Sequence, residues 1–281
     1  MRAVLLGSDG EPCLSEITDP SPPGELVTVL ACGLCGSDLE KIGVWPEGAV
    51  LGHEVVARTA DGRRVALIHH TGCGTCSRCL AGHASTCERF PEPTIVPGGF
   101  AERVRANGWV ELPDTVDVAH GTYIEPLACV LRGVERVPRG RVLVVGNGFI
   151  GRLFGAVLER RGDTVFAVDR NPLRTGVAPD GPVDAAVLCA PGGVEVAVDA
   201  VEPGGTVLVF ADARAIPAAA VYRHELTVVG SRSSTPAFME EAVALLPALA
   251  VPEPTVLPLE RFEEGLRMFR EGAVLKVVLV P

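Results

Sequence analysis

Four cysteines lie in residues 73–87 at spacings suited to binding one metal ion. Cys73, Cys76, Cys79 and Cys87 are separated by two, two and seven residues. Four thiolates can surround a tetrahedral Zn²⁺ at about 2.3 Å, and each two-residue step lets two sulfurs reach the same ion. A site closed by four cysteines has no open coordination position, so its role would be structural. Disulfides, unligated thiols and an iron–sulfur cluster are the alternatives to this interpretation.

A second set of ligand types occurs further towards the N-terminus. Cys35 stands in Cys-Gly-Leu-Cys-Gly-Ser-Asp, and His53 and Glu54 follow in Gly-His-Glu. A thiolate, an imidazole and a carboxylate leave a fourth position for water or substrate, as a Lewis-acid zinc requires. Glu125 supplies another carboxylate from an apolar stretch, where an acid is either buried with a partner or lines a cleft. Taken alone, a histidine beside a glutamate is more often a packing feature.

A Gly-x-Gly-x-x-Gly turn follows the apolar run 142–145 and precedes an amphipathic stretch that ends at Gly162. The first glycine makes a tight turn, the second lets backbone approach a pyrophosphate, and the third allows close packing of helix on strand. Strand, turn and helix in this order predict a dinucleotide site, and a glycine turn used only for packing is the alternative. The candidate cofactor-binding residues in the turn are Gly146, Asn147, Gly148, Phe149, Ile150 and Gly151.

An acidic residue completes this fingerprint. Asp169 ends the next apolar run, where it would accept hydrogen bonds from an adenosine ribose and repel a 2′-phosphate. NAD is therefore favoured over NADP, although Arg170 beside it weakens that preference.

Two regions of different pattern must position these motifs. The first, to about residue 122, is broken by Pro and Gly and holds short β-rich runs such as 26–30 and 65–68, which indicates an irregular, mostly β domain. From residue 141, apolar runs alternate with stretches of helical length, which indicates an α/β sheet. The strands expected there are 142–145, 164–169, 185–189, 206–210 and 226–230.

Composition limits the function classes. The chain has 281 residues, 47% of them hydrophobic, and a net charge of −10, so it can bury sizeable cores and carries no field that favours nucleic acid or an anionic membrane. We expect neither partner. No apolar run of about 18 residues and no export signal are present, which predicts a cytoplasmic protein. Nine cysteines in such a protein favour metal ligation over disulfides.

The order of these motifs resembles the zinc-dependent medium-chain alcohol dehydrogenase family, and Glu125 in Glu-Pro-Leu-Ala resembles its polyol, threonine and sugar dehydrogenase branch. The resemblance implies a GroES-like, mostly β catalytic domain at residues 1–122 and 252–281, with the zinc lobe at 73–87. It implies a Rossmann cofactor domain at 123–251. It also implies two zinc ions per chain, NAD as cofactor and a homodimer or homotetramer.

The resemblance also implies roles for single residues. Cys35 and His53 would be ligands of a catalytic zinc, with Glu54 and Glu125 as candidates to complete its ligand set. The four cysteines of residues 73–87 would hold the structural zinc.

Three residues next to these ligands are the catalytic candidates. Ser37 would take the alcohol proton, and Asp38 would orient the zinc ligands. Glu40 stands where many relatives have a relay histidine, so it would relay the proton or bind substrate.

One departure from the family concerns the cofactor domain. About fifteen residues separate Asp169 from the strand expected at 185, where the family has a helix, a strand and another helix. A third strand with its crossover does not fit, because such a connection takes a dozen or more residues. We therefore predict a sheet in the order 2-1-4-5-6 that lacks edge strand 3.

The predicted function is zinc-assisted, NAD-dependent oxidation of a secondary alcohol on a small polyol or sugar-like substrate. The deletion after Asp169 motivates one alternative, a non-catalytic or regulatory zinc-binding relative with an impaired cofactor site. A lyase or reductase on the same fold is another.

Overall fold

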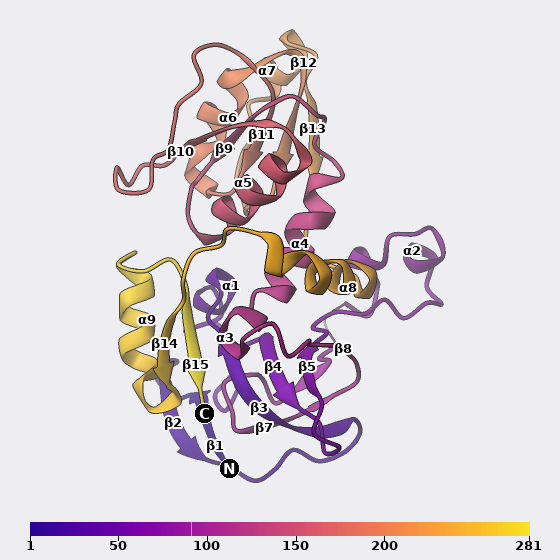
Figure 1. Cartoon of the computed structure of the whole chain (residues 1–281), viewed down its shortest axis with the longest axis vertical. Helices are drawn as coiled ribbons and strands as arrows, with labels where there is room; N and C mark the ends of the chain where they lie inside the picture. Colours follow the sequence, from indigo (N-terminus) through magenta and orange to yellow (C-terminus); the bar gives the residue numbers. More distant parts are fainter. Residues whose placement is uncertain (91) are drawn as a thin grey trace. The chain divides into compact units, whose positions relative to one another are not determined.

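The chain forms two compact units in the computed structural model, which describes residues 1–90 and 92–281. Unit 1 comprises Met1–Ala128, Ser234–Pro247 and Glu253–Pro281, and unit 2 comprises Cys129–Ser233 and Ala248–Pro252 (Figure 1). The largest difference from the predicted domains is the segment 234–247. It forms helix α8 (Pro236–Leu245), which packs on strand β8 (Trp109–Glu111) of unit 1 and was expected in the cofactor domain.

Unit 1 is built on a mostly antiparallel sheet, as the short β-rich runs predicted. Its described residues form eight strands: β3 (Glu25–Gly33), β4 (Glu54–Arg58), β5 (Arg64–Leu67), β6 (Ile95–Val96), β7 (Arg103–Ala106), β8, β14 (Thr255–Pro258) and β15 (Val277–Val280). The long strand β3 pairs with β7 through its first half and with β4 and β15 through its second. Strands β1 (Arg2–Leu6) and β2 (Pro12–Glu16) form a separate antiparallel pair.

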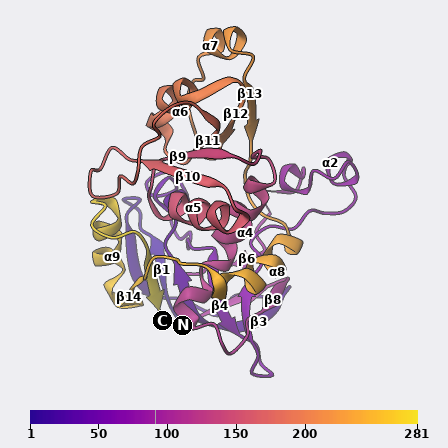
Figure 2. The same cartoon turned by 45° about the horizontal axis from the view of Figure 1, so that its top comes forward.

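Short helices connect and cover this sheet. They are α1 (Gly36–Leu39), α2 (Ser77–Leu80), α3 (Val118–Gly121), the start of α4 (Ile124–Val134), α8 and α9 (Phe262–Arg270), with 3-10 turns at Ala84–Thr86, Leu246–Ala248 and Leu259–Arg261. Helix α9 buries Phe262 and Leu266 against β14 and β15, because its apolar residues recur on one face. The segment that carries α2 extends away from the sheet in both views (Figures 1 and 2).

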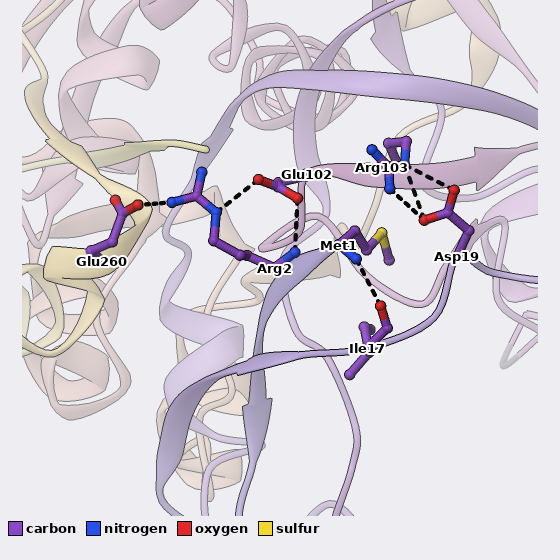
Figure 3. Close-up of polar contacts among 7 residues, drawn as sticks. All are labelled: Met1, Arg2, Ile17, Asp19, Glu102, Arg103 and Glu260. Carbon is purple, nitrogen blue, oxygen red and sulfur yellow. Dashed lines mark hydrogen bonds and ion pairs between the residues drawn. The ribbon is translucent and has the colours of Figure 1, made fainter.

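Polar contacts fix the N-terminus within unit 1 (Figure 3). The Met1 ammonium donates to the carbonyl of Ile17 at 2.8 Å. Arg2 donates from Nε to Glu102 at 2.7 Å and pairs through Nη1 with Glu260, which precedes α9. The first strand is thereby joined to the C-terminal segment, consistent with both ends of the chain lying in unit 1.

Unit 2 is a parallel sheet with helices on both faces (Figure 2). Its strands are β9 (Arg141–Val145), β10 (Thr164–Val168), β11 (Val183–Leu188), β12 (Val201–Val209) and β13 (Thr227–Gly230), and its helices are α5 (Phe149–Arg161), α6 (Val194–Ala200) and α7 (Ala218–Arg223), with a 3-10 turn at Pro191–Gly193. The strand order is β10-β9-β11-β12-β13. In Rossmann numbering this is 2-1-4-5-6, so the predicted order without strand 3 is confirmed.

A short loop takes the place of the missing strand at the edge of β10. The N–H of Ala167 donates to the carbonyl of Val177 at 3.0 Å, and the N–H of Gly176 donates back to Ala167 at 3.1 Å. These two bonds satisfy the outward backbone groups at one position of the edge strand, which would otherwise be open. No helix among the described residues combines the length and apolar content needed to cross a membrane.

Candidate functional site

The four cysteines of residues 73–87 converge in the α2 segment. The Sγ atoms of Cys73 and Cys79 lie 4.0 Å apart, and those of Cys76 and Cys87 lie 3.9 Å apart. All four sulfurs lie within 4.8 Å of one another. Sulfurs placed tetrahedrally at about 2.3 Å from zinc would be about 3.8 Å apart, so the donor set and its spacing fit a structural zinc ion.

Backbone N–H groups of this lobe point at the sulfurs. Cys76 donates to Cys73 Sγ at 3.3 Å, and Cys79 donates to Cys76 Sγ at 3.5 Å, where Cys76 caps α2. The Thr75 hydroxyl also donates to Cys73 at 3.5 Å, and these hydrogen bonds lower the pKa of Cys73 to about 5. Cys73 is therefore favoured as the thiolate that a metal ion needs, whereas burial and the neighbouring sulfurs raise the pKa of Cys79 to about 12.

Cys35, His53 and Glu54 form a second cluster, which we call the Cys-His-Glu group. One ligand atom from each lies within 4.8 Å of the others. Strand pairing explains this proximity, because Gly33 at the end of β3 lies opposite Glu54 at the start of β4. Cys35 follows β3 and caps α1, while His53 directly precedes β4. His53 and Glu54 are buried, and Cys35 is half-buried.

Asp38 contacts two residues of the Cys-His-Glu group, Cys35 and His53. It is fully buried, and its Oδ2 accepts the N–H of Cys35 at 3.1 Å while Oδ1 accepts the N–H of Gly52 at 3.3 Å. Oδ1 also lies 3.3 Å from Nδ1 of His53. Burial alone would raise the pKa of Asp38, but His53, Lys41 and the N–H of Cys35 lower it below its usual value. Asp38 is therefore a carboxylate that lies against the imidazole, and its predicted role in orienting zinc ligands stays a prediction.

Glu54 is paired with a residue from the far end of the chain. The ammonium of Lys276, just before β15, forms an ion pair with Glu54 Oε2 and donates to the carbonyl of Leu34 at 3.1 Å. A side chain at Gly33 would place its Cβ 2.1 Å from this same Oε2. The glycine of the Cys-Gly-x-Cys motif therefore leaves the space that the pair occupies.

Two atoms of the Cys-His-Glu group lack hydrogen-bond partners. Of the four buried side-chain nitrogen and oxygen atoms without one in the described residues, His53 Nδ1 and Glu54 Oε1 are two. Because Nδ1 faces Asp38 at 3.3 Å, Glu54 Oε1 is the atom of the group that no neighbour satisfies, and an unsatisfied buried oxygen beside a thiol and an imidazole marks a place for a further ligand. Sulfur, imidazole nitrogen and carboxylate oxygen are the donor types that zinc accepts. The residues present therefore fit a zinc ion.

The remaining predicted residues of this site lie on α1 and α4. The Ser37 hydroxyl donates to Cys35 Sγ at 3.5 Å, and Glu40 is exposed at the C-terminus of α1. Glu125 is 8% exposed in the first turn of α4 and lies outside the cluster of ligand atoms that joins the other three. Its place in a zinc shell stays a prediction.

Sequence reasoning missed His69, which lies next to the Cys-His-Glu group. Its ring centroid is 4.6 Å from that of His53. The rings of His69 and His70 are 3.8 Å apart between centroids, and those of His70 and Phe90 are also 3.8 Å apart. Burial lowers the pKa of His69, and the nearby charges of His53, His70 and Lys41 lower it further, so this imidazole stays neutral. Its position two residues after β5, the neighbour of β4, was the available signal.

In unit 2 the glycine-rich turn has the conformation that its three predicted roles require. Gly146 has φ +95°, and a Cβ on Gly151 would lie 2.1 Å from the carbonyl oxygen of Gly146. A Cβ on Gly148 would meet only Arg174 Nη1, at 3.8 Å, so backbone is accessible there. Helix α5 begins at the next residue, which leaves its N-terminal N–H groups at the turn.

Asp169 lies against this turn. Its Oδ2 accepts the N–H of Asn147 at 2.8 Å, and its Oδ1 accepts the N–H of Asn171 at 2.8 Å. The Asn147 amide in turn donates to the carbonyl of Arg174 at 2.6 Å. Arg170 is exposed. Arg174 was not predicted, and the shortness of the loop that fixes it beside the turn was the signal that could have found it.

Comparisons with known proteins agree with this geometry. Residues 22–114 match the family model of the alcohol dehydrogenase GroES-like domain. D-altritol 5-dehydrogenase of Agrobacterium fabrum is 31% identical over 287 residues, which cover 83% of this chain and 84% of that protein. The chain belongs to the zinc-dependent medium-chain alcohol dehydrogenase family.

Two further members extend the comparison. L-galactonate-5-dehydrogenase of Escherichia coli K12 is 30% identical over 178 residues, 57% of this chain and 52% of that protein. The alcohol dehydrogenase TADH from Thermus sp. ATN1 has a TM-score of 0.86 at 26% identity, with all of both chains covered. The predicted family, the GroES-like and Rossmann fold, and the enzyme class, an alcohol dehydrogenase, are thereby confirmed.

Proposed function

We propose that the protein is a zinc-dependent dehydrogenase that transfers hydride between NAD and a secondary alcohol of a polyol or sugar-like substrate. The observation that carries this proposal is the Cys-His-Glu group, with the unsatisfied buried oxygen of Glu54, in a chain that also keeps a complete glycine-rich turn and Asp169. The names of the altritol and galactonate dehydrogenases support the substrate class.

In this proposal the residues of unit 1 hold the metal and handle the proton. Cys35, His53 and either Glu54 or Glu125 would bind the catalytic zinc, while Asp38 fixes the imidazole. Zinc would supply the Lewis acidity that lowers the pKa of the substrate hydroxyl, and NAD would accept the hydride. The Ser37 hydroxyl would take the substrate proton, and the exposed carboxylate of Glu40 would pass it to water. A second zinc would be held by the four cysteines of residues 73–87.

In unit 2 the glycine-rich turn would bind the pyrophosphate at the N-terminus of α5, and Asp169 would accept hydrogen bonds from the adenosine ribose. Asp169 supports NAD over NADP, because its charge opposes a 2′-phosphate. The deletion that motivated the non-catalytic alternative leaves this turn and Asp169 in place. No described feature favours that alternative.

Titration of the purified protein with NADH, and separately with NADPH, followed by fluorescence, tests the cofactor half of the proposal. We expect micromolar binding of NADH and weaker binding of NADPH. Binding of neither would contradict the proposal and favour a zinc protein without dehydrogenase activity.

A screen of polyols and sugars with NAD tests the catalytic half. Cys35→Ser and His53→Ala should each lower turnover by about 10³-fold or more, because Lewis-acid stabilisation contributes several kcal/mol. NADH binding should stay nearly unchanged in both variants. Cys13→Ser, which removes a thiol of β2, is the matched control. Full turnover in either ligand variant would rule out the metal assignment.

We further propose a homodimer or homotetramer in the cytoplasm. Strand β13 ends the sheet of unit 2 with one edge unpaired among the described residues, and the family resemblance implies that this edge pairs with a second copy across a two-fold axis. The described cysteines form no disulfide, and cysteines that bind metal instead are typical of a reducing compartment. Light scattering that gave a monomer mass at micromolar concentration would contradict the oligomer.

A further inference from the structure

Lysine is rare in this chain, and both lysines lie beside carboxylates at the Cys-His-Glu group. Of 25 basic residues, 23 are arginines. Lys276 is 1% exposed and forms an ion pair with Glu54, whereas the Lys41 side chain is 21% exposed and so reaches solvent. Lys41 is also the only lysine or arginine between Arg2 and Arg58. The Lys41 ammonium is therefore accessible from solvent as well as lying beside a buried acid.

Asp38, the acid nearest to Lys41, is already satisfied without it. The Lys41 ammonium forms an ion pair with Asp38 Oδ1 at 3.6 Å, too long for a hydrogen bond, while backbone N–H groups of Cys35 and Gly52 donate to the carboxylate. Within residues 1–90 and 92–281, no hydrogen bond uses the ammonium of Lys41. Its three N–H donors are therefore available to a molecule that enters from solvent.

An aromatic ring holds the ammonium in place. Nζ of Lys41 lies 5.0 Å from the ring centroid of Trp45, within the range of a cation–π interaction, which restrains an otherwise flexible side chain. Trp45 itself is 46% exposed. The accessible indole of Trp45 offers an apolar face to the C–H groups of a sugar chain. The ammonium beside it offers a positive charge to a group at the end of that chain.

The ammonium also lies close to the Cys-His-Glu group, since Asp38 Oδ1 is 3.6 Å from Lys41 Nζ and 3.3 Å from His53 Nδ1. A molecule that contacts the Lys41 ammonium is therefore held next to the residues of this group. An ammonium donates hydrogen bonds only and carries a full charge, so it gains most from an oxyanion, with which its hydrogen bonds are charge-assisted.

We propose that Lys41 and Trp45 form a subsite for an anionic group of the substrate, so that the preferred substrate is a polyol-like chain carrying a carboxylate or a phosphate. This inference rests on the proposed dehydrogenase function and specifies its substrate class. The carboxylate or phosphate contacts Lys41 while a hydroxyl further along the chain reacts.

The test compares the ratio of kcat/KM for charged and neutral substrates. The substrates are sorbitol and altritol as neutral hexitols, gluconate and galactonate as hexonates, and sorbitol 6-phosphate. The wild type should have a higher kcat/KM for a charged compound than for the neutral hexitols. Comparing the hexonates with sorbitol 6-phosphate shows whether the subsite prefers a carboxylate or a phosphate. Lys41→Gln should lower the charged-to-neutral ratio by about 10- to 100-fold, and Lys41→Arg should restore part of it. Arg58→Gln, which removes the same charge at the outer end of β4, should leave the ratio unchanged.

A second readout needs no turnover. Gluconate or sorbitol 6-phosphate should raise the Tm of the zinc-containing protein, and Lys41→Gln should abolish this shift. Higher salt should weaken it, because the contact is partly solvent-exposed. A wild type that prefers neutral hexitols, or a Lys41→Gln variant with the wild-type ratio, would overturn the subsite while leaving the dehydrogenase intact. A wild type that oxidises none of the compounds would count against the proposed function, and the Tm shift would then decide the subsite alone.

Discussion

Lys276 and Glu54 form an ion pair in which each side chain is 1% exposed, although 222 residues separate them in the sequence. The pair joins the last strand of the chain to the Cys-His-Glu group. Because two charges buried singly would each be costly, the pair is stable only while both partners are present. It fixes one oxygen of Glu54 and leaves the other, Oε1, without a hydrogen bond.

We predict that Lys276→Met lowers the free energy of unfolding of unit 1 by about 3–5 kcal/mol, since it leaves the Glu54 carboxylate buried and unpaired. The double variant Lys276→Met/Glu54→Gln should lose much less, because no unpaired charge remains. Both tryptophans, Trp45 and Trp109, lie in unit 1, so urea unfolding followed by tryptophan fluorescence measures the effect. Arg58→Met is the exposed control. Equal losses in the single and double variants would show that packing, not charge, stabilises this position.

The four-cysteine lobe gives a second prediction. Cys87→Ser removes one of four converging sulfurs, so the zinc content should fall from two ions per chain to one, with the α2 segment becoming sensitive to protease. Elemental analysis after dialysis measures this content. Cys13→Ser should keep both ions. A wild-type chain that retains one ion, or a Cys87→Ser chain that still holds two, would contradict the assignment of the lobe.

Sequence reasoning succeeded where the signal is local. The Gly146 turn was predicted because strand, turn and helix are consecutive, and the helix ends at Gly162 with φ +95° as its sequence indicated. The strand order of unit 2 followed from chain length alone, since the loop after Asp169 is too short for a crossover. The convergence of the four cysteines followed from their spacing.

Sequence reasoning failed where a contact joins residues that are far apart in the sequence. Lys276 carried only a weak signal, a charge inside an apolar strand, and nothing in the sequence connected it to Glu54. His69 reaches His53 because β5 pairs with β4. Helix α8 lies in unit 1, whereas the resemblance implied that residues 123–251 form the cofactor domain, because the local sequence of a helix does not show against which sheet it packs.

The cofactor preference depends on Asp169. Asp169→Ser removes the charge that opposes a 2′-phosphate and leaves Arg170 and Arg174 nearby, so we predict that the ratio of NADPH to NADH affinity rises by about tenfold or more. Fluorescence titration with both nucleotides gives the ratio. Arg174→Gln should instead weaken the binding of both NADH and NADPH. Its guanidinium lies beside the glycine-rich turn, which contacts the part that the two nucleotides share, and not beside the 2′-phosphate that distinguishes them. An unchanged ratio in Asp169→Ser would remove this residue from the cofactor site.

Asp163 links the stability of unit 2 to pH. Its side chain is 1% exposed, Oδ1 accepts the N–H of Gly140 at 3.0 Å and Oδ2 pairs with Arg161 at 2.6 Å. Burial alone would raise the pKa of Asp163, but Arg161 and the N–H of Gly140 lower it below its usual value. A lowered pKa in the folded state means that the carboxylate stabilises unit 2 at pH values above its unfolded pKa of about 4. This contribution disappears as pH falls through the folded pKa.

We therefore predict that Asp163→Asn lowers the free energy of unfolding by about 1–3 kcal/mol at pH 7, and that the difference from wild type shrinks as pH falls below about 4. Because unit 2 has no tryptophan, far-UV circular dichroism or hydrogen exchange at β9 and β10 must report the unfolding. Asp180→Asn, whose partner Arg141 holds it at the exposed surface, should change nothing measurable. A difference that persists undiminished at pH 3 would mean that Asp163 acts through its shape and hydrogen bonds, and that its charge contributes nothing to unit 2.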